Sequence, residues 1–494
     1  MPASITAAEA IPQISAIFRN FALLYFTEVR EGISSSPFRK ALNRVYLLYH
    51  FIRRSNMSVA GIVAEYNPLH NGHLRLFRKV REDLGENTPI VVIMSGEFVQ
   101  RGIPALADRT SRVCALLSCG VDVVLELPFT FATGSADRFA HGAVQSLIRS
   151  GVVTDLYFGA EHSSLSDLSA IADMDPESDP MFGEVLEDCQ KKGLSYAASW
   201  QQAASSVIAS RKDSRISSDD FERIIREPNN ILAVAYLREI SRSGSSIRPH
   251  LLVREDSYHE EDLKESSFPS ATALRKQILT RYATLSKGGF ISSSSELIPH
   301  MPIPMIAEML HLWNASTIPM GEKDLIAASI PLIRSTDPAR LSSVAHMGSQ
   351  LSGHLKSEVR SLHFDPQKDI SNTFRQAVET RCFSYTRILR ALASLAVGQT
   401  EDDLSLLSDP GYLRLLGFSE KGRTVLKSMR SSSDLPIFSR ASDAFHFGKD
   451  PSISRMDELD RLSHDWWTMK ARNTFEEDFK REVIQFKRNR LYRS

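Results

Sequence analysis

The sequence predicts an α/β protein with a Rossmann-like core built on a parallel sheet, followed by a mainly α-helical carboxyl-terminal domain. Short and almost continuously apolar runs alternate with helical patterns in the first half of the chain. Such runs are typical of parallel strands that are buried on both faces. Alternating strands and helices joined by right-handed crossovers give a doubly covered sheet.

Five strands and three connecting helices account for the predicted core. The strand candidates lie at 60–65, 89–94, 121–127, 154–158 and 248–253. Helical patterns lie between them at 72–85, 107–119 and 135–150. The segment 165–242 has Ala/Ser-rich faces and charged surfaces, which predicts a helical insertion between the fourth and fifth strands.

We expect the chain to divide into three parts. Met57 leads directly into the first strand, so residues 1–56 are expected to be an amino-terminal extension that precedes the native start. Residues 57–285 would form the α/β domain and residues 286–494 the helical domain, with the Ser/Gly-rich segment 286–296 as a linker. Helices are then expected at 303–314, 323–334, 338–363, 370–396, 401–408, 420–430 and 455–487.

Composition limits the classes of function. The 59 basic and 59 acidic residues cancel, so binding to nucleic acid would need local basic patches. The four cysteines have no metal-ligand spacing, which favours reduced thiols in a cytoplasmic protein. No apolar run reaches the roughly 18 residues of a membrane span, so no membrane partner is expected.

One short motif points to chemistry. His70-Asn71-Gly72-His73 follows the first strand and the turn Tyr66-Asn67-Pro68, and it opens a helix. The start of a helix offers unpaired N–H donors and partial positive charge, and glycine lets the backbone approach a ligand. Two imidazoles there can donate to phosphate oxygens. Four such residues alone would also fit a surface turn, but their position at the first strand favours a nucleoside triphosphate site.

A later segment fits the same site. Residues 269–278 read PSATALRKQI, in which Ser270 is a plausible helix N-cap. Ser270 and Thr272 can donate hydroxyls, and Arg275 can fork onto phosphate oxygens. An HxGH motif together with a later Ser-x-Thr-x-x-Arg motif is typical of nucleotidyltransferase chemistry at an α-phosphorus.

Several ordered segments resemble the bacterial tRNA(Met) cytidine acetate ligase family. The resemblance is strong over about 58–282 and looser to about 490. The matching segments are GIVAEYNPLHNGH, VVIMSGEFVQRGIPALADR, GVDVVLELP, ADRFAHGAV, LYFGAE, PNNILAVAYL and SATALRKQI. It implies that 57–285 is an ATP-binding catalytic domain and that 286–494 binds tRNA.

The resemblance also implies a reaction and its residues. ATP would activate acetate as acetyl-adenylate, and the acetyl group would pass to N4 of the wobble cytidine of elongator tRNA(Met). Mg²⁺ would arrive with ATP, held mostly by phosphates and water rather than by protein ligands. His70, His73 and Arg275 would be catalytic. The nucleotide would contact Val63, Glu65, Tyr66, Asn67, Pro68, Gly72, Gly159, Asn229, Asn230, Arg254, Ser270 and Thr272.

Other residues keep two interpretations. Ser95-Gly96 and Gln100-Arg101-Gly102 could line the acetate or cytidine pocket or form a structural loop. Asp137 and Glu126 could face a metal, although capping is the simpler role. Where the family has a lysine-aromatic pair, this chain has Asp108-Arg109, so a lysine contact would pass to Arg109. The RNA-binding candidates combine basic residues with an aromatic one: Arg381, Tyr385, Arg387 and Arg390.

Two alternative functions share parts of this pattern. A small-molecule adenylyltransferase would use the same two motifs but would not need some 200 mostly helical residues after the core. A non-catalytic RNA-binding protein could retain a degenerate nucleotide site, but the intact His70, Gly72, His73, Ser270 and Arg275 argue against degeneration.

Overall fold

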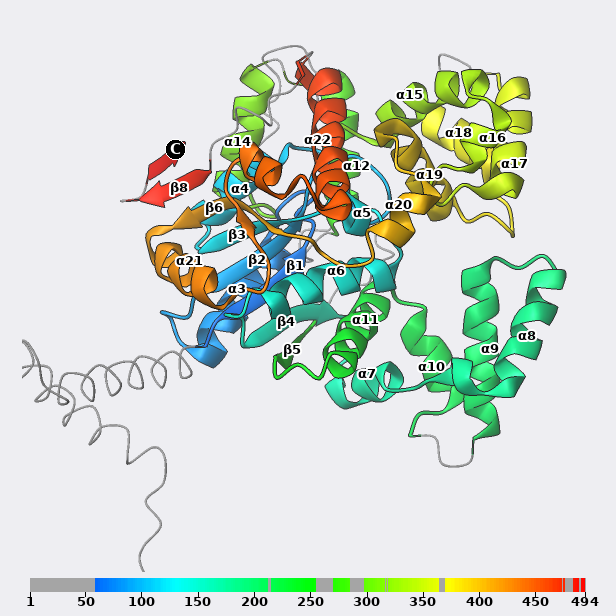
Figure 1. Ribbon diagram of the computed structural model, residues 1–494, viewed down its shortest axis with the longest axis horizontal. Coiled ribbons are helices and arrows are strands. Elements are labelled where there is room, and N and C mark those ends of the chain that lie inside the picture. The colour runs from blue at the N-terminus through cyan, green and yellow to red at the C-terminus, as the bar shows by residue number, and fades with distance from the viewer. Residues whose placement is uncertain are drawn as a thin grey trace, which may run out of the picture. The chain divides into compact units, whose positions relative to one another are not determined.

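The computed structural model describes residues 58–211, 215–254, 270–284, 297–315, 317, 319–363, 369–472, 474–475, 483–487 and 490–493. The expected extension 1–56 and the expected linker 286–296 lie outside the described residues. In the described part, nine strands form one sheet in the order β5-β4-β1-β2-β3-β6-β8-β9, with β7 beside β6 (Figure 1).

The predicted parallel core is confirmed. Each of the five predicted strands is present, and together they pair in parallel in the order β5-β4-β1-β2-β3. Because β1 lies in the middle, its carboxyl end opens onto the edge where ligands bind in doubly wound sheets. Their bounds are β1 Ala60–Ala64, β2 Ile90–Ser95, β3 Val123–Leu127, β4 Asp155–Ala160 and β5 Arg248–Val253.

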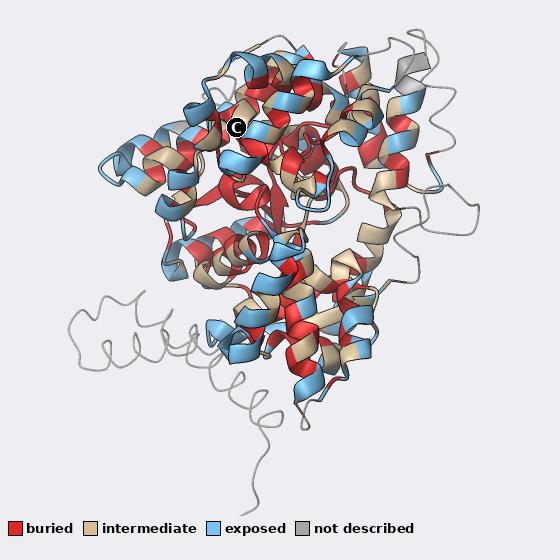
Figure 2. Ribbon diagram, turned by 90° about the vertical axis from the view of Figure 1, so that its right-hand side faces the viewer, coloured by how far each residue is buried: buried red, intermediate tan, exposed pale blue. Residues whose placement is uncertain are grey.

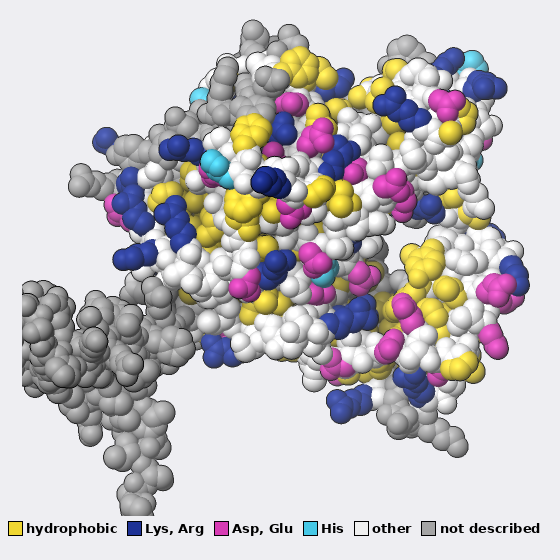
Figure 3. All heavy atoms as spheres, in the orientation of Figure 1, with side chains coloured by type: hydrophobic (Ala, Val, Ile, Leu, Met, Phe, Trp, Pro, Cys, Tyr) yellow, Lys and Arg dark blue, Asp and Glu magenta, His cyan; other side chains and the backbone are white. Residues whose placement is uncertain are grey.

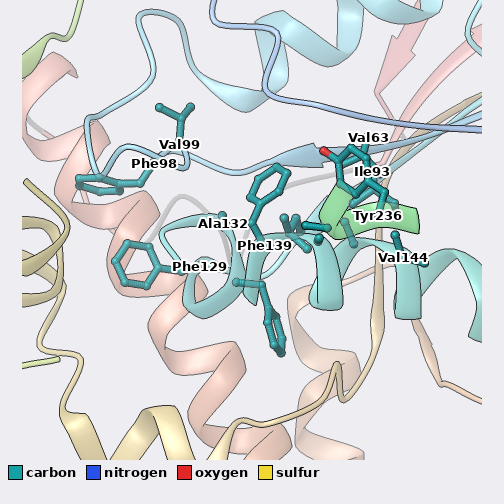
Figure 4. Close-up of a cluster of buried hydrophobic side chains, with 14 of the residues drawn as sticks. Val63, Ile93, Phe98, Val99, Phe129, Ala132, Phe139, Val144 and Tyr236 are labelled. Atoms are coloured by element: carbon teal, nitrogen blue, oxygen red, sulfur yellow. The ribbon is translucent and has the colours of Figure 1, made fainter. Parts of the chain in front are cut away.

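Alternate residues of the strands enter two separate cores. On one face, Ile62 and Val92 pack with α3 (Asn71–Leu84), α4 (Arg109–Ser118), α12 (Ala271–Thr284) and α14 (Ile303–Asn314). On the other, Val91 and Ile93 pack with α6 (Ala136–Arg149) and α11 (Pro228–Arg242). Figure 4 shows part of this second core, and Figure 2 shows the buried strands between exposed helix surfaces. The strands are therefore covered on both faces, as their continuous apolar character predicts.

Helices fill the segment between β4 and β5. They are α7 Leu165–Ala172, the 3-10 turn η1 Pro176–Ser178, α8 Pro180–Lys191, α9 Tyr196–Ser210, α10 Ser218–Ile225 and α11. The helices after the core are α15 Glu322–Ser335, α16 Pro338–Ser342, α17 Gly348–Ser361, α18 Ile370–Val378, α19 Tyr385–Val397 and α20 Glu401–Leu406. Among the described residues, no helix has both the length and the apolar character to cross a membrane.

The end of the chain differs from the sequence expectation. It returns to the sheet with β6 Leu413–Ser419, which pairs antiparallel with β3, and with β8 Ile484–Lys487, which pairs with β6. The described helix ends at Arg472, and the expectation of a helix over 455–487 is wrong at 484–487, where β8 gains main-chain partners in the sheet. The remaining elements are α5 Phe129–Ala132, α21 Glu420–Ser432, β7 Ile437–Phe438, η2 Ala441–Phe447, α22 Pro451–Arg472 and β9 Arg490–Arg493.

Two of the expected long helices are each broken in two. The pattern over 338–363 gives α16 and α17, which are separated by a turn that contains His346 at φ 66°. The pattern over 370–396 gives α18 and α19, and the bend between them lies at 379–384. A non-glycine residue with positive φ is not helical, so the break at His346 is local and backbone-driven.

Buried charges join α22 to the core. Arg414 of β6 pairs with Asp457 and lies 3.7 Å from Glu126 and 3.9 Å from Asp460. Asp460 accepts the backbone N–H of Phe129 at 2.7 Å. These groups are almost fully buried, so each depends on its partners in place of water.

The pH dependence of stability should report on Asp460. Burial, then the nearby Glu126, raises the pKa of this carboxyl from 3.8 to about 7, although Arg414 opposes the shift. Between these two values the unfolded chain has released a proton that the folded chain retains, so stability should fall as pH rises, by at most about 1.4 kcal/mol per pH unit. Urea unfolding at pH 5 and pH 7.5 should show this fall in the wild type. It should be smaller in Asp460→Asn, and an equal fall in both proteins would contradict the assignment.

Candidate active site

The turn after β1 is held in shape by its own side chains. Tyr66 adopts φ 49°, the Asn67–Pro68 peptide is cis, and His70 is the N-cap of α3. The Asn67 side-chain oxygen accepts the backbone N–H of Leu106 at 2.9 Å. This bond joins the turn to the loop that leads into α4. Because the turn follows β1, both histidines lie at the carboxyl edge of the sheet.

The two imidazoles are locked as the same tautomer. Nδ1 of His70 accepts the backbone N–H of Gly72 at 3.1 Å, and Nδ1 of His73 accepts that of His70 at 3.2 Å. Their ring centroids lie 3.9 Å apart. An Nδ1 that accepts a hydrogen bond carries no proton, so the neutral ring carries its hydrogen on Nε2. The histidines thus cap the helix with one nitrogen and retain an Nε2–H donor on the other.

The surroundings keep both rings neutral. Burial, then Arg254 and Arg275, lowers the pKa of His70 to about 3. Burial, then His70 and Arg254, also places the pKa of His73 well below its ordinary value. Both rings are therefore neutral hydrogen-bond donors at pH 7, and the nearby positive charge is supplied by the two arginines.

Gly72 is required for the position of His70. A Cβ at residue 72 would lie 2.7 Å from Cε1 and 2.9 Å from Nδ1 of the His70 ring. Gly72→Ala should therefore displace this imidazole and lower kcat about 100-fold, the effect of roughly 1 Å of misplacement. Stability should change little, because alanine is a good helix former. Steady-state kinetics beside thermal unfolding test this, and an unchanged kcat would show that the ring is not placed by this contact.

The later motif lies against this turn. Ser270 caps α12 by accepting the backbone N–H of Ala273 at 3.2 Å. Arg275 donates to the Asn67 carbonyl at 2.7 Å and to the Thr272 hydroxyl at 3.0 Å. Residues separated by about 200 positions are thus brought together, as the two motifs predict. Anchoring by a backbone carbonyl holds the guanidinium of Arg275 beside His70.

Arg254 enters the site from β5. Its backbone N–H donates to the carbonyl of Ala160 at 2.8 Å, and its charge contributes, after burial, to the lowered pKa of both imidazoles. A Cβ at Gly159 would stand 3.5 Å from Cγ of Arg254, so this glycine packs against the arginine stem. Gly159 and Arg254 therefore form one wall of the candidate site.

The two asparagines of α11 have structural partners. Asn230 accepts the backbone N–H groups of Glu161 and His162, both at 2.9 Å, and donates to the Ile224 carbonyl at 2.9 Å. Asn229 donates to the Glu161 carboxylate at 2.5 Å. Asn230 thus fixes the turn after β4, and direct contact of either amide with ATP stays a prediction. Sequence reasoning missed Glu161 as a site-shaping residue, although it follows the strand LYFGA.

Two buried polar atoms beside the histidines have no hydrogen-bond partner among the described residues. They are the Tyr66 hydroxyl and the Asn67 side-chain nitrogen. Burial raises the pKa of Tyr66, so its hydroxyl stays protonated and can donate. Such orphaned donors are rare in folded proteins, and a ligand that accepts from them would account for both.

The neighbouring loop is tied to Glu65. Its carboxylate accepts the backbone N–H of Gln100 at 2.8 Å, and its carbonyl accepts from Arg112 at 2.9 Å. Val63, at the end of β1, is buried in the apolar core. These contacts make Glu65 and Val63 supports of the turn, and their contact with a nucleotide stays a prediction.

The structure shows the partners of three residues for which the sequence left two interpretations. Arg109 is fully buried and pairs with Glu126 at 2.6 Å, so Arg109 is not at a surface where it could replace the lysine of the family. Glu126 thus faces arginines, and Asp137 pairs with Arg238 at 3.0 Å. The described residues contain no group of three or more His, Cys, Asp or Glu that could hold a metal ion.

The expectation that Tyr385 stacks on RNA is wrong. Its ring is buried, and its hydroxyl donates to Glu322 at 2.5 Å. The guanidinium of Arg375 lies over the same ring, 5.0 Å from its centroid. A base has no open face of this ring to stack on.

Comparisons with known proteins agree with the site. The HIGH Nucleotidyl Transferase family model matches residues 57–482. The tRNA(Met) cytidine acetate ligase of Acetivibrio thermocellus is 32% identical over 423 residues, which are 84% of this chain and 96% of that protein. The ligase of Syntrophomonas wolfei is 36% identical over 393 residues, which are 78% and 88% of the two chains.

A solved structure is also similar. Thermotoga maritima TmcAL bound with alpha-thio ATP superposes with a TM-score of 0.75 at 27% identity, covering 87% of this chain and all of that one. The fold and the paired imidazoles thus define a nucleotidyl transferase of the HIGH class. Within that class, the chain belongs to the tRNA(Met) cytidine acetate ligase family.

Proposed function

We propose that this enzyme activates acetate with ATP and transfers the acetyl group to N4 of the wobble cytidine of elongator tRNA(Met). The observation that carries the proposal is the pair of neutral Nε2–H donors on His70 and His73, flanked by Arg254 and Arg275. Donors fixed before the substrate arrives stabilise charge that develops in a transition state.

In the first step, an acetate oxygen attacks the α-phosphorus of ATP. The bond from that phosphorus to the α,β-bridging oxygen breaks, and pyrophosphate leaves with the electron pair. The two imidazoles donate to the phosphate oxygens on which charge grows, and Arg275 and Arg254 balance the triphosphate. The products are acetyl-adenylate and pyrophosphate. Mg²⁺ would enter with ATP and be held mainly by phosphates and water.

In the second step, N4 of the cytosine attacks the acetyl carbonyl carbon. The bond between that carbon and the adenylate oxygen breaks, AMP leaves, and the amine loses a proton. The cytosine amine is a weak nucleophile because its lone pair is delocalised into the ring, so an activated acyl donor is required. An anticodon loop can present such a base unstacked, and the cytoplasm is where tRNA, ATP and acetate meet.

An isotope experiment tests the first step. With acetate labelled by ¹⁸O in both oxygens, one label should appear in AMP and none in pyrophosphate, because the bridging oxygen of acetyl-adenylate comes from acetate. Mass spectrometry of the AMP formed with tRNA(Met) reads this directly. Unlabelled AMP would contradict attack by acetate on the α-phosphorus. Adenylate transfer to another small acceptor would instead favour a small-molecule adenylyltransferase.

A further inference from the structure

The start of α19 concentrates positive charge. Arg387 and Arg390 lie on its first two turns, and the first turn contains no acidic residue. The N-cap Ser384 makes no capping hydrogen bond through its side chain. A helix amino terminus already carries partial positive charge. One anion is present at this end, because the Glu379 carboxylate accepts the backbone N–H of Tyr385 at 3.4 Å, but that carboxylate pairs with Arg375 at 2.7 Å.

This helix end is joined to the candidate active site. Arg390 donates from Nε to the carbonyl of Gln100 at 3.0 Å, and the N–H of Gln100 donates to Glu65 at 2.8 Å. Gly102, at φ 80°, lies so close to α19 that a Cβ would be 2.5 Å from the backbone nitrogen of Arg390. Arg390 is thus two hydrogen bonds away from the strand end that carries the histidines.

His346 completes the cluster. Arg387 donates from Nε to its carbonyl at 3.1 Å, and its Nε2 is buried without a hydrogen-bond partner among the described residues. Its backbone is held at φ 66°, a costly conformation for a non-glycine residue. Burial, followed by Arg390, Arg138 and Arg387, lowers the pKa of His346 to about 4. A neutral, unpartnered imidazole therefore stands among guanidinium groups.

Positive charge exceeds negative charge in this cluster. The cluster contains four arginines, which are Arg101, Arg138, Arg387 and Arg390. Two glutamates oppose their charge, Glu65 and Glu401, and the Glu401 carboxylate accepts the backbone N–H of His346 at 3.1 Å. Burial, then the charge of Arg101, lowers the pKa of Arg390 to about 10. On the face in Figure 3, Lys and Arg are mixed with Asp and Glu over the middle, and several Lys and Arg lie together at the left, over α21. Among these named groups, four arginines and two glutamates leave an excess of two positive charges.

We propose that Arg387, Arg390 and His346 bind a backbone phosphate of the substrate RNA, beside the nucleotide whose base enters the site. The inference rests on the proposed function. The triphosphate has its own cations in Arg254 and Arg275, which act on the catalytic imidazoles. A base that leaves its stack brings flanking phosphates to the rim of the site, and guanidinium groups fork onto phosphate oxygens.

Two measurements on the full-length enzyme separate the possible roles. The first is binding of tRNA(Met) at several salt concentrations, and the second is acetate-dependent exchange of pyrophosphate into ATP without RNA. Arg387→Gln and Arg390→Gln should each weaken tRNA binding about tenfold or more. Each should also reduce the slope of log Kd against log salt by about 1. Acetate-dependent exchange should stay within about twofold of wild type. Arg430→Gln, which removes the same charge from an exposed position on α21, should change neither.

Other outcomes overturn the inference. A raised KM for acetate with unchanged tRNA binding would show that these arginines bind acetate and not RNA. No change in either measurement would show that these arginines bind neither substrate. If the glutamine variants unfold, Arg387→Lys and Arg390→Lys decide, because they keep the charge and should keep the wild-type salt slope. A lower slope in the folded lysine variants would contradict a phosphate contact. Failure of the wild-type enzyme to bind tRNA(Met) would instead remove the proposed function itself.

Discussion

His70→Asn and His73→Gln are expected to lower kcat about 10²- to 10³-fold while leaving the fold intact. Each replacement keeps a capping acceptor but loses the imidazole ring that fixes the Nε2–H donor, and the amide N–H groups that replace it are not held in that position. Asparagine is a favoured N-cap, and glutamine at the third helical position can accept the N–H of the cap residue. The variants lose a fixed donor that stabilises the charge developing at the α-phosphorus. Removing one such donor typically lowers kcat about 10²- to 10³-fold.

The matched variants separate catalysis from folding. His70→Ala removes both the cap and the donor, so it should also lose about 1 kcal/mol of stability, whereas His70→Asn should not. Acetate-dependent exchange of pyrophosphate into ATP measures the chemical step, and urea unfolding measures stability. Near-wild-type exchange in both His70→Asn and His73→Gln would show that the imidazoles only cap α3.

Arg414→Met is expected to destabilise the protein by about 3–5 kcal/mol, although Arg414 lies outside the candidate active site. The replacement leaves Asp457, Asp460 and Glu126 buried without their shared cation. The contact between α22 and the end of β3 should weaken first. Arg430→Met, at an exposed position of α21, should stay within about 0.5 kcal/mol of wild type.

Unfolding in urea measures this loss of stability, provided that the slope of the unfolding free energy against urea concentration is the same in the variant and the wild type. A loss below about 1 kcal/mol would mean that water or a rearranged carboxylate replaces the guanidinium. A large loss would show that the last hundred residues stabilise the catalytic core. In that event, a fragment that ends near residue 285 should not fold on its own.

The core could be predicted because its signals are local. Each parallel strand is a continuous apolar run, and His70-Asn71-Gly72-His73 follows the first one directly. The meeting of Arg275 with that turn could be anticipated because both motifs serve one triphosphate. The tautomer of the histidines could not, because it depends on which backbone N–H each Nδ1 meets.

The misjudged residues depend on long-range partners. In the sequence, Tyr385 is an aromatic residue near arginines. In the structure its ring is buried, and its hydroxyl donates to Glu322 of another helix. The strands β6 and β8 exist because the open edge of β3 offers main-chain partners, which the local pattern does not record. The hydrogen bonds of Asn230 to the turn after β4 could not be anticipated either, for the same reason, and its contact with ATP stays a prediction.

The most direct test of the central claim is acetylation of purified elongator tRNA(Met) with ATP and radiolabelled acetate, with His73→Gln measured alongside. We predict label at N4 of the wobble cytidine with the wild-type enzyme, and at least a 100-fold lower rate with the variant. Absence of label from the RNA, while ATP is consumed with another acceptor, would contradict the account. Label that forms equally fast with the variant would contradict the role given to the imidazoles.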